Sequence, residues 1–499
     1  MNIKQAKEYI EQTVRIYLKK NELGDYVIPV VRQRPVFMLG APGVGKTAIM
    51  EQIAEELSVA LVSYSMTHHT RQSAIGLPFI KKQTYAGEEF DVTEYTMSEI
   101  IASIYETMEE SGIREGILFL DEINCVSETL APSMLQFLQY KIFGRHRVPE
   151  GWVIVTAGNP PEYNRSVREF DVAVLDRMKV LNVDPDYSVF KEYASERSLH
   201  PAIVNFLDMK REYFYKIENT VNGRSYVTAR GWEDLSEIIK LYEEEGLKVT
   251  DTLIDQYIKN ERAVREFDAY YDLFNKYKKD YRIEEILLGE DTKASVQRAK
   301  QASFDERLSL LSMLMDRLKL DIKNVVRKVD YISYAAPVLK GCSGQSGNEL
   351  IDYIGRVYEG SVKKLSGMKR AGSLSQDEEY KLKKAAKLFL EIKKSLVNGS
   401  GTYEDIKRKY NGEVMTIKKD SDKASGELEN VFGFSEEAFE GGNELLILLT
   451  ELTVNPYTSR FIAKFGSEGY EKHQSELMIT ERQIDMQAEA RELLKYETL

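Results

Sequence analysis

The feature that most constrains this chain is a glycine-rich segment, GAPGVGKT, at residues 40–47. An aliphatic stretch at 35–40 precedes it and a helical pattern follows it, which is the setting that a phosphate-binding loop requires. Glycines let backbone N–H groups converge on phosphate oxygens without Cβ clashes, and the helix that follows presents its positive end to the same charge. The segment therefore predicts a strand, a phosphate-binding loop and a helix; the alternative is a glycine-rich turn that binds nothing.

Two side chains at the end of the segment predict what the loop binds. Lys46 is expected to reach the β- and γ-phosphates of a nucleotide, and the Thr47 hydroxyl is expected to ligate Mg²⁺. ATP and Mg²⁺ are therefore the predicted ligands. The predicted nucleotide-binding residues are Gly40, Ala41, Pro42, Gly43, Val44, Gly45, Lys46, Thr47, Ala48 and Asp121.

A second motif, GILFLDE at 116–122, is an apolar strand that ends in two acids. Neighbouring buried carboxylates are costly without a cation, so Mg²⁺ explains the position of Asp121, which we expect to ligate the metal with Thr47. Glu122 is then placed to orient and polarise the water that attacks the γ-phosphate. The alternative interpretation of the acid pair is a helix N-cap.

A third apolar strand, WVIVTA at 152–157, is followed by GNPP. Asn159 would emerge beside Glu122 if the two strands are neighbours, and its amide could hold the water or a γ-phosphate oxygen. An Asx turn before Pro160 and Pro161 is the alternative.

The order of the elements predicts the fold class. Short apolar strands at 35–40, 60–65, 116–121, 152–157 and 179–183 alternate with helical stretches, which indicates an α/β fold with a parallel sheet covered by helices. The length of 499 residues predicts about three modules: this core at 1–188, a helical second module at 189–280, and a mainly α-helical region of unknown role at 281–499. Loops are expected in the last region at 341–347, 366–377, 398–402 and 420–425.

Composition narrows the class of protein further. The formal net charge of -12 disfavours nucleic acid as a partner. The longest aliphatic run, 445–449, is far too short to cross a membrane, and the amino-terminal residues lack the pattern of a signal peptide. Two cysteines are too few for a disulfide framework, so we expect a cytoplasmic protein.

The series GAPGVGKT, LFLDEIN, VIVTAGNPP, FDVAVLDRM and VTARGWEDL, spread over about residues 30–245, resembles the ordered signature of AAA+ ATPases, specifically of MoxR-like proteins. The resemblance implies a P-loop NTPase αβα sandwich, a helical lid, ATP bound between them, and a homo-oligomeric ring, usually a hexamer. In this comparison Asn159 is similar to the sensor-1 residue, and Arg230 resembles the sensor-2 arginine of the lid.

The same resemblance predicts a residue that acts between subunits. Arg177 is similar to the arginine finger that a neighbouring subunit inserts at the γ-phosphate, where a delocalised guanidinium suits the spread negative charge. Arg165 and Arg168 lie nearby and leave the assignment open. An ion pair of Arg177 with Asp171 or Asp176 is the alternative interpretation.

Two further segments resemble inserts of the MoxR-like branch. Residues 79–95 alternate around a glycine turn at 86–89, like the helix-2 insert hairpin of the family, and residues 141–149 resemble the hairpin before sensor 1, although they are shorter than in many members.

The predicted function is that of a chaperone-like AAA+ ATPase. The chain would hydrolyse ATP to ADP and phosphate, with Glu122, Asn159, Arg177 and Arg230 as catalytic residues, and couple lid and ring motion to the remodelling or assembly of a protein partner. By analogy with the family, that partner carries a von Willebrand factor A domain. The alternatives are a nucleotide-dependent assembly switch with little turnover, and a nucleic-acid-dependent translocase.

Overall fold

The structure is a computed structural model that describes residues 1–68, 76–143, 145–163, 167–220, 223–290, 292–398, 402–439 and 442–474. The chain divides into two compact units. Unit 1 contains residues 1–190, 228–230 and 356–386; unit 2 contains residues 191–227, 231–355 and the described part of 387–499. The module boundaries at 188 and 280 stay a prediction.

Unit 1 is built on a five-stranded parallel sheet of order β2-β5-β8-β1-β9. The strands are β1 (Val36–Gly40), β2 (Ala60–Ser65), β5 (Gly116–Asp121), β8 (Trp152–Gly158) and β9 (Lys179–Val183). All five were expected from the sequence, to within one residue at each end. The α/β prediction is therefore confirmed.

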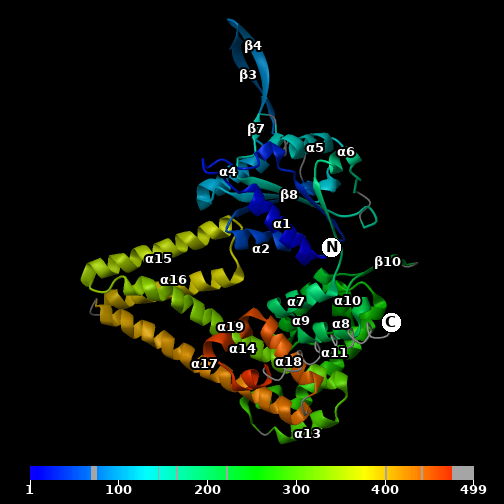
Figure 1. Ribbon diagram of the computed structural model, residues 1–499, viewed down its shortest axis with the longest axis vertical. Helices are drawn as coiled ribbons and strands as arrows, with labels where there is room; N and C mark the ends of the chain where they lie inside the picture. Colours follow the sequence, from blue (N-terminus) through cyan, green and yellow to red (C-terminus); the bar gives the residue numbers. More distant parts are fainter. Residues whose placement is uncertain are drawn as a thin grey trace, which may run out of the picture. The chain divides into compact units, whose positions relative to one another are not determined.

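Side chains alternate between the two faces of this sheet, and helices cover both faces (Figure 1). On one face, Ile117, Phe119 and Val155 pack with α1 (Ile3–Tyr17) and α2 (Ala48–Leu57). On the other, Leu118, Leu120 and Ile154 pack with α4 (Glu99–Ser111) and α5 (Ala131–Tyr140). The result is the αβα sandwich of a P-loop fold.

The outer edge of the sheet, at β2, is covered by a segment distant in sequence. The Leu61 N–H donates a hydrogen bond of 2.8 Å to the Ala371 carbonyl, and Ala371 is fully buried in the core of unit 1. Arg370 pairs with Glu110 of α4 at 3.3 Å. These residues belong to the connection between α15 (Gly347–Arg370) and α16 (Gln376–Asn398), which thus protects an otherwise unpaired strand edge.

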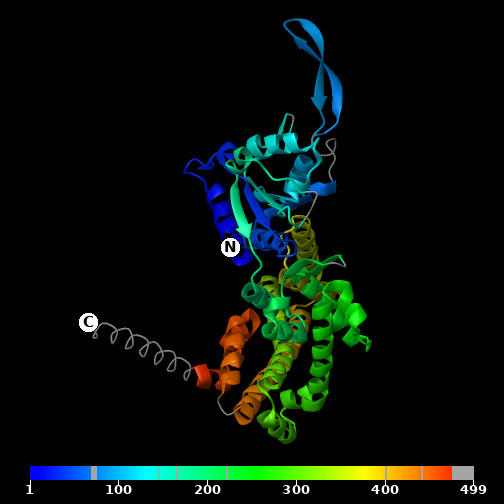
Figure 2. The same ribbon diagram turned by 90° about the vertical axis from the view of Figure 1, so that its right-hand side faces the viewer.

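Two antiparallel hairpins extend unit 1. β3 (Pro78–Tyr85) and β4 (Glu88–Tyr95) form a ribbon that projects from the sheet in both views (Figures 1 and 2). Its two-residue turn, Ala86 and Gly87, has positive φ at both positions and is shorter than the predicted turn. The second hairpin, β6 (Ile142–Phe143) with β7 (His146–Arg147), is as short as its sequence suggested. A four-residue helix, α6 (Val172–Leu175), precedes β9.

Unit 2 is mainly helical, in agreement with the sequence. The long helix α14 contacts α8, α11, α17 and α19, and buries Leu310, Leu314, Leu318 and Ile322 on one stripe. In the described ranges, no helix has the length and apolar content that crossing a membrane requires. Apart from α15 and α16, which span both units, the helices wholly or mainly in unit 2 are α7 (Tyr187–Arg197), α8 (Pro201–Met209), α9 (Ala229–Glu244), α10 (Asp251–Tyr257), α11 (Glu261–Tyr281), α12 (Ile283–Leu288), α13 (Lys293–Gln301), α14 (Phe304–Lys340), α17 (Tyr403–Phe439), α18 (Asn443–Val454) and α19 (Pro456–Phe465).

The structure corrects two details of the helical regions. The second module, expected to be helical over 189–280, also contains a hairpin of β10 (Lys216–Thr220) and β11 (Gly223–Val227). The loop expected at 420–425 is wrong, because α17 runs through it. There, Asp420 accepts a hydrogen bond of 2.7 Å from Lys328 on α14, and the hydroxyl of buried Ser421 donates to the Lys418 carbonyl within α17. A tertiary contact and a bond within the helix thus satisfy residues that otherwise favour a turn.

Candidate nucleotide-binding site

Three neighbouring strands bring the predicted site residues to one edge of the sheet. β5, β8 and β1 lie side by side and run in the same direction, so their carboxyl ends meet at the same edge. β1 ends at Gly40, β5 at Asp121 and β8 at Gly158. The loop at 40–47, the acid pair and Asn159 therefore leave the sheet together.

The loop at 40–47 has the backbone of an anion cradle. Gly43 and Gly45 have φ of 74° and 94°, a region that side-chain-bearing residues rarely adopt. Helix α2 begins directly after the loop, with Thr47 at its N-cap position. The positive end of this helix therefore lies at the loop, which favours a phosphate there.

Lys46 is held at the centre of the loop. Its side chain donates hydrogen bonds to the carbonyls of Gly40 (2.7 Å) and Ala41 (2.9 Å) and to Oδ1 of Asn159 (2.9 Å). The residue is only 8% exposed. These bonds hold the ammonium group between the loop and the end of β8, in direct contact with the side chain of Asn159.

Lys46 should give ATP binding a pH dependence. Burial lowers the pKa of its ammonium group to about 8, although Asp121 and Glu122 partly oppose the shift. A triphosphate against Nζ would raise this pKa again, so binding above about pH 8 requires the uptake of a proton. We expect affinity for MgATP to change little between about pH 7 and 8 and to fall by up to about tenfold per pH unit above that. Calorimetry in two buffers of different ionisation enthalpy measures the uptake; its absence at about pH 9 would contradict the expectation.

The oxygen atoms of Thr47 and Asp121 fit a Mg²⁺ ion. The Thr47 hydroxyl donates to Oδ2 of Asp121 at 2.9 Å, so the two predicted ligands lie side by side. Oδ1 of Asp121 accepts the N–H of Glu122 at 2.9 Å, which fixes the carboxylate plane. Hydroxyl and carboxylate oxygens are the hard donors that Mg²⁺ prefers.

Glu122 has an unusual backbone and a partner from the neighbouring strand. Its φ of 54° lies in the left-handed region, which is uncommon for a residue other than glycine and marks functional sites when the surroundings enforce it. Its Oε2 accepts a hydrogen bond of 3.2 Å from the hydroxyl of Ser65, the last residue of β2. The Ser65 hydroxyl therefore helps to orient the carboxylate of Glu122.

Asn159 is positioned by a second asparagine. Nδ2 of Asn124 donates to the Asn159 carbonyl at 2.8 Å, and Asn124 is 3% exposed. Gly158 allows this approach, because a Cβ there would lie 2.4 Å from the Asn124 side chain. Asn159 and Glu122, both in the described chain, share no hydrogen bond; the amide of Asn159 instead meets Lys46.

The start of α9 reaches the same loop. A Cβ added to Gly43 would lie 3.2 Å from Cβ of Thr228 and 3.5 Å from Cβ of Arg230. Burial is the main cause of the low pKa of Lys46, and the positive charge of Arg230 lowers this pKa further. The predicted sensor-2 arginine is therefore at the phosphate loop, within unit 1.

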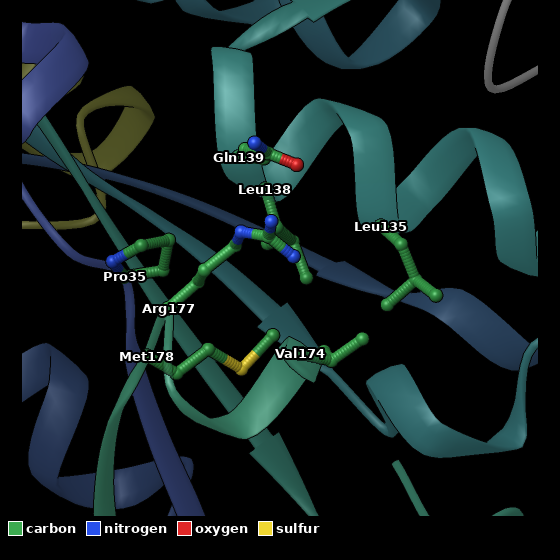
Figure 3. Close-up of a pocket in the computed structure, with 7 residues that line it drawn as sticks. All are labelled: Pro35, Leu135, Leu138, Gln139, Val174, Arg177 and Met178. Carbon is green, nitrogen blue, oxygen red and sulfur yellow. The ribbon is translucent and has the colours of Figure 1, made fainter. Parts of the chain in front are cut away.

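Arg177 lies elsewhere on the surface of unit 1. It is exposed directly after α6, and its guanidinium donates to the Ala173 carbonyl at 3.1 Å. No ion pair joins it to Asp171 or Asp176 in the described chain. Arg177 lines a small pocket, whose volume is about 40 Å³. Figure 3 shows Arg177 with the other lining residues, Pro35, Leu135, Leu138, Gln139, Val174 and Met178.

The other two arginines named with Arg177 differ from it. Arg168 pairs with Glu128, and its backbone N–H donates to the Asn124 carbonyl. Arg165 lies outside the described residues. Of the two described candidates, only Arg177 has a guanidinium without an acidic partner.

Residues 35–178, which hold every site residue above except Arg230 and Thr228, match the family model described as "AAA domain (dynein-related subfamily)". The chain carries an AAA+ ATPase domain. A search of curated proteins finds no match. The family match supports the AAA+ resemblance, while membership of the MoxR branch stays a prediction.

Two residues of the AAA+ domain that contact the site were missed in the sequence. Ser65 stands at the end of β2, next to β5, and a polar residue at the end of a neighbouring strand was the available signal. Asn124 follows the acid pair by two residues, but its role depends on the approach of Gly158 from another strand. Nothing local to Asn124 indicates that contact.

Proposed function

We propose that the AAA+ domain hydrolyses ATP to ADP and phosphate, and that the chain uses this reaction to remodel or assemble a protein partner. The observation that carries the proposal is the meeting of Lys46, the Thr47–Asp121 pair and Glu122 at one edge of the sheet. A scaffold that only binds nucleotide needs the first two features. The oriented carboxylate of Glu122 favours hydrolysis.

The binding roles follow from the contacts around the loop. Lys46 exchanges its hydrogen bonds with the loop carbonyls for β- and γ-phosphate oxygens, while the start of α2 faces the same charge. Thr47 and Asp121 would hold Mg²⁺, which neutralises part of the negative charge on the phosphates.

The catalytic roles follow from the groups beside the phosphates. Glu122 accepts a proton from the attacking water, and the hydroxyl of Ser65 holds its carboxylate in one orientation. Asn159, fixed by Asn124, orients the water or a γ-phosphate oxygen. Arg230 adds positive charge at the loop from the start of α9, so nucleotide binding can pull on that helix.

The remaining part of the proposal concerns assembly. Arg177 is exposed and has no acidic partner among the described residues, which supports a role at the site of a neighbouring subunit in a ring, usually of six in this family. We further propose that the chain belongs to the MoxR-like branch, acts in the cytoplasm, and remodels a partner with a von Willebrand factor A domain. Steady-state phosphate release tests hydrolysis: none above background from an assembled sample would favour the assembly switch, and a several-fold rise on adding DNA would favour the translocase.

Arg177→Ala is expected to bind ATP normally and to lose at least about 100-fold in phosphate release, because a charge that stabilises the transferring phosphoryl group is missing. ATP affinity is measured by calorimetry and turnover by phosphate release. Arg168→Ala serves as the control, since Arg168 already pairs with Glu128, and should retain most activity.

Mixing variants tests whether Arg177 acts between subunits. Arg177→Ala has an intact loop but no finger, whereas Lys46→Ala has the finger but no working loop. If the finger acts in trans, mixing the two inactive variants restores measurable phosphate release. Wild-type turnover by Arg177→Ala alone would remove the residue from the reaction.

A further inference from the structure

Unit 2 contains a cavity of about 590 Å³ that lies outside the nucleotide site. Residues from α8, α9, α11, α12 and α14 and from the segment before α8 line it. Its volume is within the roughly 300–1,000 Å³ of small-molecule sites. Apolar side chains contribute part of the wall, among them Phe274, Met313 and Leu320.

Most charged side chains of this cavity already have partners of opposite charge. Glu243 interacts with His200 (3.2 Å), Tyr271 (2.8 Å) and Lys278 (2.9 Å). Burial alone would raise the pKa of Glu243, but the contacts with His200 and Lys278 outweigh it and lower this pKa to about 2. These groups are satisfied within the chain and leave little capacity for a ligand.

The same holds at the rim of the cavity. Arg282 pairs with Glu285 and Arg317 pairs with Glu284, each at 3.3 Å. A highly charged anion such as a phosphate therefore meets cations that acids already neutralise. The pairing disfavours a phosphorylated ligand at this cavity.

Three charged groups of the cavity form no ion pair within 4.0 Å in the described chain: Glu244, which is exposed to solvent, and two half-buried groups of opposite charge, Asp316 and Lys240. Asp316, on α14, forms no hydrogen bond and no ion pair with any described residue. Among the described residues, Lys240, on α9, donates only to the backbone carbonyl of Ser198. Both line the cavity, yet they do not pair with each other within 4.0 Å.

We propose that this cavity binds a small zwitterion, a free amino acid with an apolar side chain. Asp316 would accept the ammonium group, Lys240 would donate to the carboxylate, and Phe274 and Met313 would contact the apolar body. A ligand with an ammonium group alone would leave Lys240 without its partner, and one with a carboxylate alone would leave Asp316. The proposal is independent of the proposed ATP hydrolysis.

The cost of Asp316 to the fold supports a binding role. Burial raises the pKa of its carboxyl group despite the nearby His200, Lys240, Lys319 and Lys278. Because the folded-state pKa is raised, ionisation destabilises the fold at pH above that pKa, and the penalty disappears in acid below the unfolded value. Ionisation of a carboxyl group with a purely structural role would instead stabilise the fold.

Asp316→Asn is therefore expected to raise the unfolding temperature of the full chain near neutral pH, with no gain in acid, and to weaken ligand binding by at least about tenfold. Thermal unfolding and calorimetry measure the two effects. The control is Glu261→Gln, an exposed acid at the start of α11 outside the cavity, which should change neither. A lower unfolding temperature of Asp316→Asn near neutral pH would overturn the proposal.

The ligand class is tested with one apolar body in three forms: L-phenylalanine, phenethylamine and 3-phenylpropionate, with L-leucine and L-methionine as further zwitterions. At least one amino acid should bind with a Kd below about 1 mM, and the two half-ligands at least about tenfold more weakly. Lys240→Met should weaken amino acid binding likewise, whereas Lys276→Met, an exposed lysine on α11, should not. No binding by any of the three amino acids, or equal binding by either half-ligand, would overturn the proposal.

Discussion

Lys46→Ala is expected to lose ATP affinity by about 100-fold or more, because the variant lacks the ammonium group that the β- and γ-phosphates would contact. Hydrogen bonds to charged groups contribute about 1.5–3 kcal/mol each, and Lys46 has three donors at the centre of the loop. The fold should tolerate the change, since burial already disfavours the charged form of this lysine.

A second buried lysine in the same unit provides the matched control. Lys141 is 1% exposed, burial lowers its pKa to about 7, and its ammonium donates to the Val30 carbonyl outside the site. Lys141→Met removes a comparable group and should leave the Kd for ATP unchanged. Calorimetry on both variants decides: unchanged affinity in Lys46→Ala would refute the role of the loop.

The parts of the site that the sequence predicted are those that local chemistry determines. The loop at 40–47 contains its glycines, its lysine and the N-cap residue of the helix that follows within eight residues, so the pattern itself implies the cradle. The acid pair follows a fully apolar strand, and parallel neighbours bring that strand end to the loop. Short-range patterns were therefore enough to predict that Lys46, Thr47 and Asp121 lie together at this edge of the sheet.

The contacts that the sequence did not predict join segments distant in the chain. Ser65 meets Glu122 only because β2 pairs with β5, and Ala371 meets Leu61 only because the α15–α16 connection returns to the sheet. Sequence patterns gave no indication of that return. Such contacts depend on tertiary packing, and the residue types that make them occur at many positions without a special role.

Two errors in the helical regions have different physical origins. The β10–β11 hairpin had a local signal, an Asn-Gly dipeptide at 222–223, that the helical pattern around it obscured. The false loop at 420–425 followed turn-forming residues whose preference is overridden in α17, where Asp420 and Lys423 bond partners on α14. Tertiary contacts decide such segments.

The local structure at Glu122 allows its carboxylate to be removed without disturbing the backbone. A left-handed φ in a residue with a side chain persists only when the surroundings enforce it, and here the Asp121 carboxylate and the Ser65 hydroxyl both bond the residue. Glutamine has nearly the same shape as glutamate and can keep the Ser65 hydrogen bond. The substitution therefore removes the proton acceptor while retaining the local structure.

Glu122→Gln is expected to bind ATP with wild-type affinity and to lose about 100- to 10,000-fold in turnover, the usual contribution of general base catalysis. With hydrolysis blocked, the ATP-bound protein should accumulate as a larger assembly, which light scattering with size-exclusion chromatography detects. Glu128→Gln, an exposed acid six residues later, serves as the isosteric control and should turn over normally. Wild-type phosphate release by Glu122→Gln would exclude it as the base, whereas lost ATP binding would place its carboxylate in the binding step.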